Sequence, residues 1–296
     1  MTTTTRRLAL TRALVTGFAV IYLAIRAPHI LDVAELPATR FRPIGVVGFL
    51  TESPVATWLI FLALALALVS GALATIGWQH RWSGPTFALL LLWLLSYRLS
   101  WGQVLHTENL MVLHVLVLGF GGPACAERLG RTIGTPRRVH PWPLHLMSAV
   151  TAATYLIAAW AKIRNGGVDW ITGDTLRNQI AHDNLRKLLL GDVHSALGGW
   201  LTRYGWVFAP LAAASMLVEL GAPLAIVWKR LTLWWIGLAW LFHIGVLALM
   251  AILFPYQLFA VAYASMLPLD EWSVHINSVI SRRPRRRSPR AHLLPG

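Results

Sequence analysis

Long apolar segments recur along this chain and restrict its fold more than any other feature. The segment from Val55 to Ile76 contains no charged residue, and further apolar runs follow it almost to the C-terminal end. A helix needs about 20 mostly apolar residues to cross a bilayer. The chain of 296 residues is 56% hydrophobic and only 13% charged, with a mean hydropathy of +0.58. These values exclude an ordinary soluble domain and indicate a membrane protein.

We therefore expect an all-α fold, a polytopic integral membrane helical bundle with about eight transmembrane segments. The predicted spans are residues 8–27, 55–76, 87–96, 110–122, 144–161, 204–228, 231–253 and 256–267. They lie in a transmembrane domain of residues 8–270, between a leader of residues 1–7 and a basic tail of residues 271–296. Residues 169–203 are polar and amphipathic, so we expect this segment to lie at the membrane interface.

The distribution of basic residues predicts the orientation of the bundle. The net charge is +14, and six arginines stand between Arg282 and Arg290. Basic residues also dominate the leader and the loops after the second, fourth and sixth predicted spans, and such loops face the cytoplasm. We therefore expect a multi-pass protein of the cell membrane with both termini in the cytoplasm. The tail is expected to rest near anionic lipid, so membrane lipid and not nucleic acid is the expected partner.

Several ionisable side chains lie at apparent membrane depth, among them His114, Lys162, Glu219 and His243. Each is costly in hydrocarbon and marks a functional site when it faces the interior of the bundle. Lys162 could instead snorkel to the headgroups, and Glu219 could be a structural partner of Arg12 or Lys162. Either histidine could be a hydrogen-bonded core residue. The presence of all four in one small bundle favours a shared polar pocket.

Several other kinds of site lack their sequence patterns. The single Cys125 excludes an intrachain disulfide and a cysteine-rich metal site. Histidine and glutamate pairs with metal-ligand spacing are also missing, so no metal is expected. There is no Gly-x-Ser-x-Gly nucleophile motif and no phosphate-binding glycine loop with its lysine. A small-solute transporter is disfavoured because no inverted repeat is visible.

Lys162 lies at the centre of a pattern that resembles a known family. The pattern is Tyr-x-x-Ala-x-x-x-Lys, a polar turn, and Asp-Trp-x-x-Gly, formed here by Tyr155, Ala158, Lys162, Asp169, Trp170 and Gly173. Two patches agree with it: Phe242-His243 followed by Ile-Leu-Phe-Pro-Tyr-Gln at residues 252–257, and the polar junction His106-Thr-Glu-Asn109-Leu-Met. Together they resemble the HTTM domain, the membrane domain of vitamin K-dependent gamma-carboxylases. The resemblance covers most of the chain, from about the first predicted span to the last.

The resemblance implies an integral membrane enzyme that uses oxygen and a reduced naphthoquinone, either menaquinol or vitamin K hydroquinone. It implies epoxidation of the quinone, coupled in the family to carboxylation of a peptide glutamate with carbon dioxide. Lys162 would be the base that deprotonates the hydroquinone, because a lysine in an apolar pocket can accept a proton near neutral pH. His243 would hydrogen-bond near the quinone, and His106 or Asn109 would hold the reacting oxygen. The cofactor would be bound by Tyr155, Asn109, His114, Trp170 and Glu219.

A second function stays open at this point. Carboxylases of the family carry a large extracytoplasmic domain that recognises their protein substrate, whereas this chain has the arginine tail after its last predicted span. Ala161 precedes Lys162 where the family often has another lysine. The alternative is a non-catalytic membrane module that binds quinone, lipid or a partner, for example in export or maturation of a secreted peptide. A secreted or membrane peptide is thus a candidate partner in either case. A buried Lys162 beside an apolar cavity would favour the enzyme, and exposure to headgroups the module.

Overall fold

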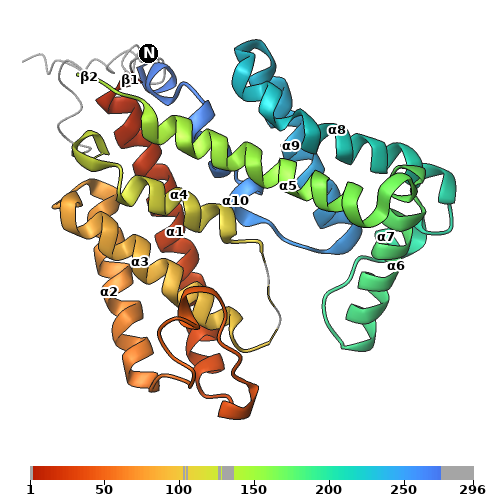
Figure 1. The fold of residues 1–296 in the computed structure, drawn as a ribbon, viewed down its shortest axis with the longest axis horizontal. Coiled ribbons are helices and arrows are strands. Elements are labelled where there is room, and N and C mark those ends of the chain that lie inside the picture. The colour runs from red at the N-terminus through yellow and green to blue at the C-terminus, as the bar shows by residue number, and fades with distance from the viewer. Residues whose placement is uncertain (1–2, 103, 105, 126–127, 129–136, 275–296) are drawn as a thin grey trace, which may run out of the picture.

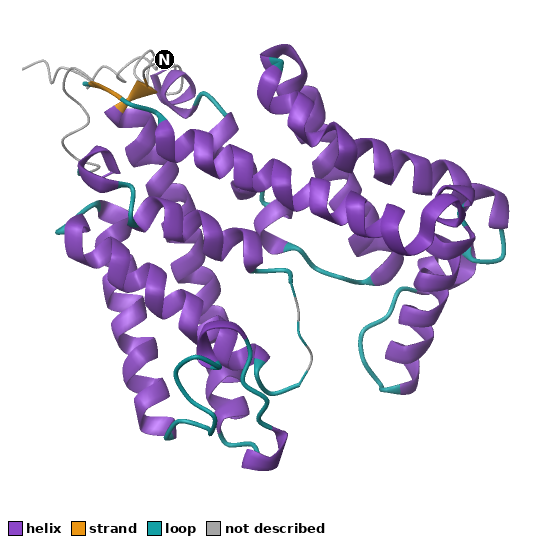
Figure 2. Ribbon diagram, viewed as in Figure 1, coloured by secondary structure: helices purple, strands orange, loops and turns teal. Residues whose placement is uncertain are grey.

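The computed structural model describes residues 3–102, 104, 106–125, 128 and 137–274, which are almost entirely helical (Figure 2). The all-α prediction is confirmed. In this part of the chain the strands are β1 (Thr3–Thr4) and β2 (Arg138–Val139), which pair antiparallel. The hydroxyl of Thr4 also donates to Asp270 at 2.7 Å. The start of the chain, the approach to α5 and the segment near residue 270 therefore meet at one end of the molecule (Figure 1).

Helices α1 to α4 form one packed group, on the left of Figure 1. Their bounds are Thr5–Ala34 (α1), Thr57–Ile76 (α2), His80–Leu99 (α3) and Asn109–Gly119 (α4), with 3-10 turns at Ala38–Arg40, Gly45–Val47 and Gly122–Cys125. α1, α2 and α3 approach closely at Gly71, where an added Cβ would lie 2.5 Å from Val20 and 2.8 Å from Phe87. A small residue at this point lets membrane helices pack against one another.

Helix α5 (Trp142–Thr172) crosses the middle of the molecule and packs against both α4 and α8 (Figure 1). It is broken at Gly167, where φ is 52° and ψ is −134°. Glycine adopts such angles readily because it has no Cβ. The break lets the last turn of α5 place the ring of Trp170 against Lys162. The Gly-Gly pair after the apolar run thus shapes the surroundings of the lysine.

The second group contains α6 (Asp174–Leu189), α7 (Ala196–Leu201), α8 (Phe208–Val227) and α9 (Lys229–Met250), with a 3-10 turn at Gly205–Val207. After α9 the chain returns through α10 (Pro255–Leu258) and the 3-10 helix η5 (Val261–Met266). η5 packs against α1 and α5, so the returning segment joins the two groups. α8 packs along α5 and against α9. These contacts bring side chains of α5, α8, α9 and η5 together in one region.

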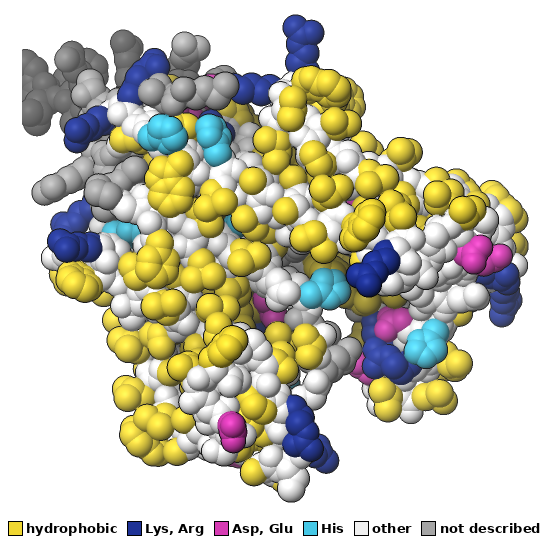
Figure 3. Space-filling view, viewed as in Figure 1, with side chains coloured by type: hydrophobic (Ala, Val, Ile, Leu, Met, Phe, Trp, Pro, Cys, Tyr) yellow, Lys and Arg dark blue, Asp and Glu magenta, His cyan; other side chains and the backbone are white. Residues whose placement is uncertain are grey.

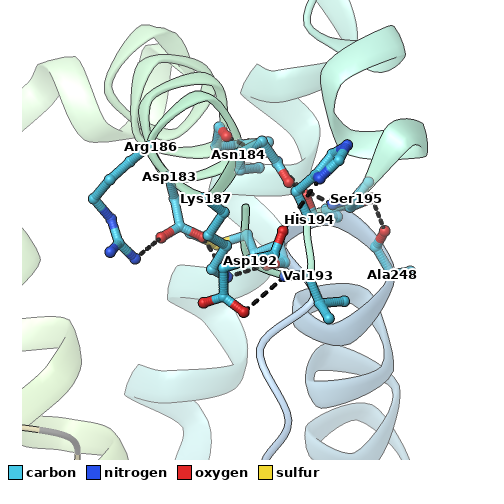
Figure 4. Close-up of polar contacts among 12 residues, drawn as sticks. Asp183, Asn184, Arg186, Lys187, Asp192, Val193, His194, Ser195 and Ala248 are labelled. Carbon is cyan, nitrogen blue, oxygen red and sulfur yellow. Dashed lines mark hydrogen bonds and ion pairs between the residues drawn. The ribbon is translucent and has the colours of Figure 1, made fainter. Parts of the chain in front are cut away.

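The connection between α6 and α7 closes the C-terminal end of α9 (Figure 4). The last carbonyls of a helix have no partner within it. Three side chains donate to them: Asn184 to Leu249 at 2.8 Å, Lys187 to Met250 at 2.6 Å, and Ser195 to Ala248 at 2.5 Å. The positive charge of Lys187 also suits the negative end of the helix dipole. These hydrogen bonds hold the end of α6 and the residue before α7 against the C-terminal end of α9.

Five helices are long and apolar enough to cross a membrane. They are α1, α2, α5, α8 together with the turn before it, and α9. Their outer surfaces carry large exposed apolar side chains, including Phe61, Trp58 and Trp234 at 63%, 65% and 77% exposure. In Figure 3 hydrophobic side chains cover most of the face, and charged ones gather near its edges and around a hollow right of centre. Apolar surface on this scale is expected where lipid and not water surrounds a protein. The chain is a membrane protein with several helices able to span the bilayer.

The prediction of eight spans is not confirmed. α4 is apolar but has 11 residues, which at 1.5 Å each reach about 16 Å, roughly half of the hydrocarbon core. The eighth predicted span, residues 256–267, is divided between α10 and η5, because Ala260 adopts a left-handed φ of 58°. α3 has the length of a span but is not among the five apolar helices. Hydropathy along the sequence does not show where a helix ends, which matters for α4 and for residues 256–267.

The other predicted boundaries are only partly within the described residues. The segment predicted at the interface, residues 169–203, contains the end of α5, α6 and α7, with Leu188 and Leu189 exposed. Residues 1–2 of the predicted leader and residues 275–296, which hold the arginine-rich part of the tail, lie outside them. The orientation of both termini therefore stays a prediction.

Candidate functional site

Lys162 of α5 forms an ion pair with Glu219 of α8. Lys162 Nζ lies 2.6 Å from Glu219 Oε1, and the two side chains are 17% and 3% exposed. Nζ also lies 4.8 Å from the ring centre of Trp170 and 5.6 Å from that of Phe242. Both distances are within the range of cation–π interactions. Lys162 is thus paired and largely enclosed, which differs from a lysine that snorkels freely to the headgroups.

Of the two partners considered for Glu219, the structure selects Lys162. Arg12 is fully buried elsewhere, and its guanidinium donates to the backbone carbonyls of Cys125 and, at 3.4 Å, of Thr75. The second carboxylate oxygen of Glu219, Oε2, is buried and has no hydrogen-bond partner within the described part of the chain. A buried carboxylate oxygen in this condition is costly unless something pairs with it.

Tyr155 and His243 form the second part of the site. Tyr155 lies about two helical turns before Lys162, so both project from the same side of α5. The Tyr155 hydroxyl lies 2.9 Å from His243 Nε2 on α9 and 2.7 Å from the hydroxyl of Tyr263 on η5. His243 Nδ1 is buried and, among the described residues, has no hydrogen-bond partner. The histidine therefore presents one free ring nitrogen to its surroundings.

Aromatic rings connect this histidine with both Lys162 and His106. The His243 ring centre lies 5.1 Å from that of Phe242 and 4.9 Å from that of Phe254. Phe254 lies 5.5 Å from the ring of His106, which is exposed. Six of the residues predicted for the site therefore belong to one contact network: Lys162, Glu219, Trp170, Tyr155, His243 and His106. The structure adds Phe242, Phe254 and Tyr263 to this network. We call these nine residues the Lys162 cluster.

The structure leaves two predicted site residues outside this cluster. His114 of α4 is fully buried, and its ring nitrogens contact the Tyr256 hydroxyl at 2.7 Å and the Met147 carbonyl at 3.1 Å. The Thr151 hydroxyl also lies 3.1 Å from Nε2. Both nitrogens are satisfied, as in a core histidine. Asn109 is the exposed first residue of α4, and its side chain makes no hydrogen bond to any residue that the structure describes. Neither side chain makes a hydrogen bond to a residue of the Lys162 cluster within the described part of the chain.

A second buried ion pair was missed in the sequence. Arg98 of α3 donates to both oxygens of Glu108 at 2.6 and 2.8 Å, with side chains 4% and 3% exposed. The Tyr22 hydroxyl of α1 also donates to Glu108. Glu108 stands two residues after His106 in the polar junction, and Arg98 ends the preceding apolar run. The sequence could have indicated this ion pair, because Arg98 and Glu108 carry opposite charges on the two sides of one short connection.

The Lys162 cluster has the properties of a site for a flat ligand with polar atoms. Aromatic rings of Trp170, Phe242 and Phe254 supply apolar surface, and small-molecule sites combine such surface with a few polar groups. Those polar groups are the ammonium of Lys162, the free oxygen of Glu219 and the free nitrogen of His243. For a metal the donor set is poor, because in the described ranges no group of three or more His, Cys, Asp or Glu side chains could hold an ion.

Comparison with known proteins adds no relative. No protein-family model, no curated protein and no solved structure matches the chain. The similarity to the HTTM domain therefore rests on the motif residues alone, and the functional interpretation rests on the chemistry of the Lys162 cluster.

Proposed function

We propose that the protein is an integral membrane enzyme that binds a reduced naphthoquinone at the Lys162 cluster and uses it with oxygen, with epoxidation of the quinone as the reaction. The observation that carries this proposal is the free Nδ1 of His243, held between two aromatic rings and next to the Phe242 side chain that contacts Lys162. A buried histidine with one bonded and one free nitrogen is suited to receive a ligand. The site lies on membrane-spanning helices, where a lipid-soluble cofactor is found.

The residues present fit the ring system of a hydroquinone. Phe242 and Phe254 offer faces for a fused aromatic ring, and offset stacking of such rings is favourable. His243 Nδ1 and Glu219 Oε2 are buried polar atoms without partners, which two ring oxygens could satisfy. The bound hydroquinone would supply the reducing power that activates oxygen. Closure of the site by Trp170 would keep water away from this chemistry.

The Lys162–Glu219 pair can serve as the proton acceptor of the site. Transfer of one proton from Nζ to the carboxylate across 2.6 Å converts a charged pair into a neutral one. Burial penalises both charges, so the neutral pair is closer in free energy here than in water. Neutral Lys162 can then take a proton from a ligand hydroxyl, as a general base must. Glu219 would thereby hold a proton at Oε1 while Lys162 acts.

The ion pair also supports a second candidate function. A lysine bonded directly to a carboxylate can serve only to fasten α5 to α8, and the cluster would then bind quinone, lipid or a partner without turnover. Such a module would need the aromatic surface and His243 but not proton transfer by Lys162. A coupled carboxylation of a peptide glutamate with carbon dioxide would be a further step of the enzyme, with a secreted or membrane peptide as substrate.

Formation of quinone epoxide distinguishes the two functions. The native protein in lipid nanodiscs would receive chemically reduced menaquinone and oxygen, and the epoxide would be measured by mass spectrometry. Lys162→Met alone leaves Glu219 buried without its cation, so the double variant Lys162→Met/Glu219→Gln is compared as well. Lys187→Met is the matched control, since Lys187 is also buried and pairs with a carboxylate, Asp183, at 2.7 Å.

We expect epoxide from the native chain and from Lys187→Met, and at least a hundredfold less from both Lys162 variants, the usual scale for loss of a general base. Equal rates in native and Lys162 variants would show that Lys162 is not the base. Absence of epoxide in every sample, together with tight binding of menaquinone that depends on His243, would favour the binding module. Absence of both turnover and binding would reject quinone as the ligand.

A further inference from the structure

The chain after α9 runs back through the bundle without forming a continuous helix. α9 ends at Met250 beside α6, whose Lys187 donates to the Met250 carbonyl at 2.6 Å. The chain then returns to the end of the molecule where β1 and β2 meet, and there Asp270 accepts a hydrogen bond from Thr4. The first part of this return, residues 251–254, is neither helix nor strand and crosses the middle of Figure 1. We call residues 251–254 the return segment.

The return segment leads from the end of α9 to the Lys162 cluster. Its last residue is Phe254, whose ring centre lies 4.9 Å from that of His243. His243 stands about two helical turns before Met250, the last residue of α9. The return segment therefore descends from the end of α9 to the level of His243 inside the bundle.

Two residues of the return segment have backbone groups without hydrogen-bond partners. Neither Ile252 nor Leu253 makes a backbone hydrogen bond to any residue that the structure describes. Hydrocarbon offers no partner for such groups, so non-helical backbone at membrane depth occurs where protein covers it or where it lines a water-filled space. Protein does not cover this stretch, because Ile252 is partly exposed and Leu253 is 52% exposed. A water-filled space is the arrangement that remains.

Polar side chains stand at both ends of the return segment. At its start, Lys187 binds the Met250 carbonyl and pairs with Asp183 at 2.7 Å. At its end, the exposed ring of His106 lies 5.5 Å from that of Phe254. The space-filling view shows a hollow between the two helix groups, bordered by charged and histidine side chains (Figure 3). Such a border suits water and not lipid tails, in which charged groups are costly.

We infer that the return segment lines a water-filled entrance through which a polar, water-soluble reactant reaches the His106 side of the Lys162 cluster. Water satisfies the backbone groups of Ile252 and Leu253 and solvates His106. The ring of Phe254 contacts both His106 and His243, and His243 is only 5% exposed, so the water stops at this ring. The cluster thus has a buried side for a lipid-soluble ligand and a water-exposed side for a polar reactant. The assignment of the two sides rests on the proposed quinone function, whereas the entrance does not.

Cysteine labelling tests the entrance, because the chain has a single cysteine, Cys125, which is buried. In a Cys125→Ala background, Leu253→Cys is compared with Leu241→Cys in nanodiscs. Leu241 is the matched control, since its exposure of 58% is similar but it lies in the middle of α9, where the helix bonds its own backbone. The probe is a cationic methanethiosulfonate, which stays in water and reacts with the thiolate.

We expect Leu253→Cys to react about a hundredfold faster than Leu241→Cys, because hydrocarbon suppresses ionisation of a thiol. Equally slow reaction at both positions would show that lipid fills the hollow and would overturn the inference.

Lysine substitutions at the same two positions give a second measurement that needs no label. A lysine is tolerated in water and costly in hydrocarbon. Leu241→Lys should therefore unfold at a lower SDS fraction than the native chain, and Leu253→Lys should unfold at about the native fraction. Equal destabilisation by the two substitutions would count against a water-filled entrance.

Formation of quinone epoxide separates the entrance from the quinone function. Leu253→Cys that carries the cationic label should form epoxide from reduced menaquinone at the native rate, because the quinone reaches the buried side from lipid. Loss of epoxide on labelling would show that the quinone itself uses the entrance and would overturn the two-sided assignment. If the labelling rates are as expected and no sample forms epoxide, the entrance stands and the quinone function fails.

Discussion

The two halves of the membrane bundle each contain a buried carboxylate–cation pair. The pairs differ in how many oxygens of the carboxylate are hydrogen-bonded. In the half formed by α1 to α4, both oxygens of Glu108 receive bonds from Arg98 and Tyr22 adds another. In the half formed by α5, α8 and α9, one oxygen of Glu219 binds Lys162 and the other has no partner among the described residues. Both oxygens of Glu108 are thus hydrogen-bonded within the protein, whereas the second oxygen of Glu219 could still accept a hydrogen bond from a ligand.

The histidines repeat this difference. His114 lies between α4 and α5 with both ring nitrogens bonded, whereas His243 has one bonded and one free nitrogen. Buried polar groups in folded proteins are nearly always satisfied, so unsatisfied ones are informative. Their concentration around Lys162 separates the part of the bundle that holds the fold together from the part that is arranged for a ligand. Substitutions of the carboxylates and of the histidines test this division by stability, from the largest effect to the smallest.

Replacement of each glutamate by glutamine should break the two ion pairs with unequal cost. Glu108→Gln leaves Arg98 buried and charged, because a guanidinium does not give up its proton in proteins, and we expect a loss of about 3–5 kcal/mol. Glu219→Gln leaves Lys162, which is partly exposed and keeps its contacts with the rings of Trp170 and Phe242, so a loss of about 1–2 kcal/mol is expected. Reversible unfolding by SDS in mixed micelles measures both free energies. Equal losses would contradict the division of the bundle into saturated and unsaturated halves.

Replacement of the two histidines should also cost unequal amounts of unfolding free energy, with smaller losses than at the glutamates. His114→Phe removes the partner of the buried Tyr256 hydroxyl, and we expect a loss of about 2–3 kcal/mol. His243→Phe leaves Tyr155 bonded to Tyr263, so the expected loss is about 1 kcal/mol. The same SDS titration compares them, with Phe242→Leu as a control for ring packing near His243. A larger loss at His243 would mean that this residue is structural and would weaken the proposed site.

Much of the site could be predicted from the sequence because charge in an apolar run has few explanations. Lys162, Glu219 and His243 were selected for that reason, and the resemblance pointed to Lys162 and His243 as well. The three residues do lie in one contact network. His114 satisfied the same criterion and belongs to the core instead. Sequence shows that a histidine is at membrane depth but not what its two nitrogens meet. That depends on Met147 and Tyr256, which lie far from His114 along the chain.

The number of spans was harder to predict for a related reason. Hydropathy marks residues 256–267 as apolar, but the left-handed Ala260 divides them and places Tyr263 against Tyr155. The Arg98–Glu108 pair was missed because its two residues were assigned to a span end and a loop. Pairing across such a junction depends on the packing of α1, α3 and α4, which local sequence does not encode.

A third carboxylate–cation group lies within helix α6, and its carboxylate is expected to contribute least to the free energy of unfolding. Asp183 of α6 lies 2.7 Å from Lys187 and 3.0 Å from Arg186 (Figure 4). Burial raises the pKa of the Asp183 carboxyl, but hydrogen bonds and positive charge from these two residues outweigh burial, so its pKa lies below the ordinary value of 3.8. Since its folded pKa is lowered, the group stabilises the fold above its unfolded pKa of about 4. That contribution is lost as the pH falls through the folded pKa.

The effect of Asp183→Asn should therefore be the smallest of the three carboxylate substitutions, and it should disappear in the acidic range. Near neutral pH the loss should stay under about 1 kcal/mol, because ion pairs between neighbouring turns of one helix contribute little to stability. Below the folded pKa the native chain and Asp183→Asn should unfold at the same SDS fraction, since the carboxyl is then neutral in both. Unfolding titrations of the two proteins from pH 7 down to about pH 3 measure the difference. A difference that persists unchanged at the acidic end would show that Asp183 acts through packing and not through charge. The three carboxylates would then no longer fall in the order set by how completely each is paired and buried.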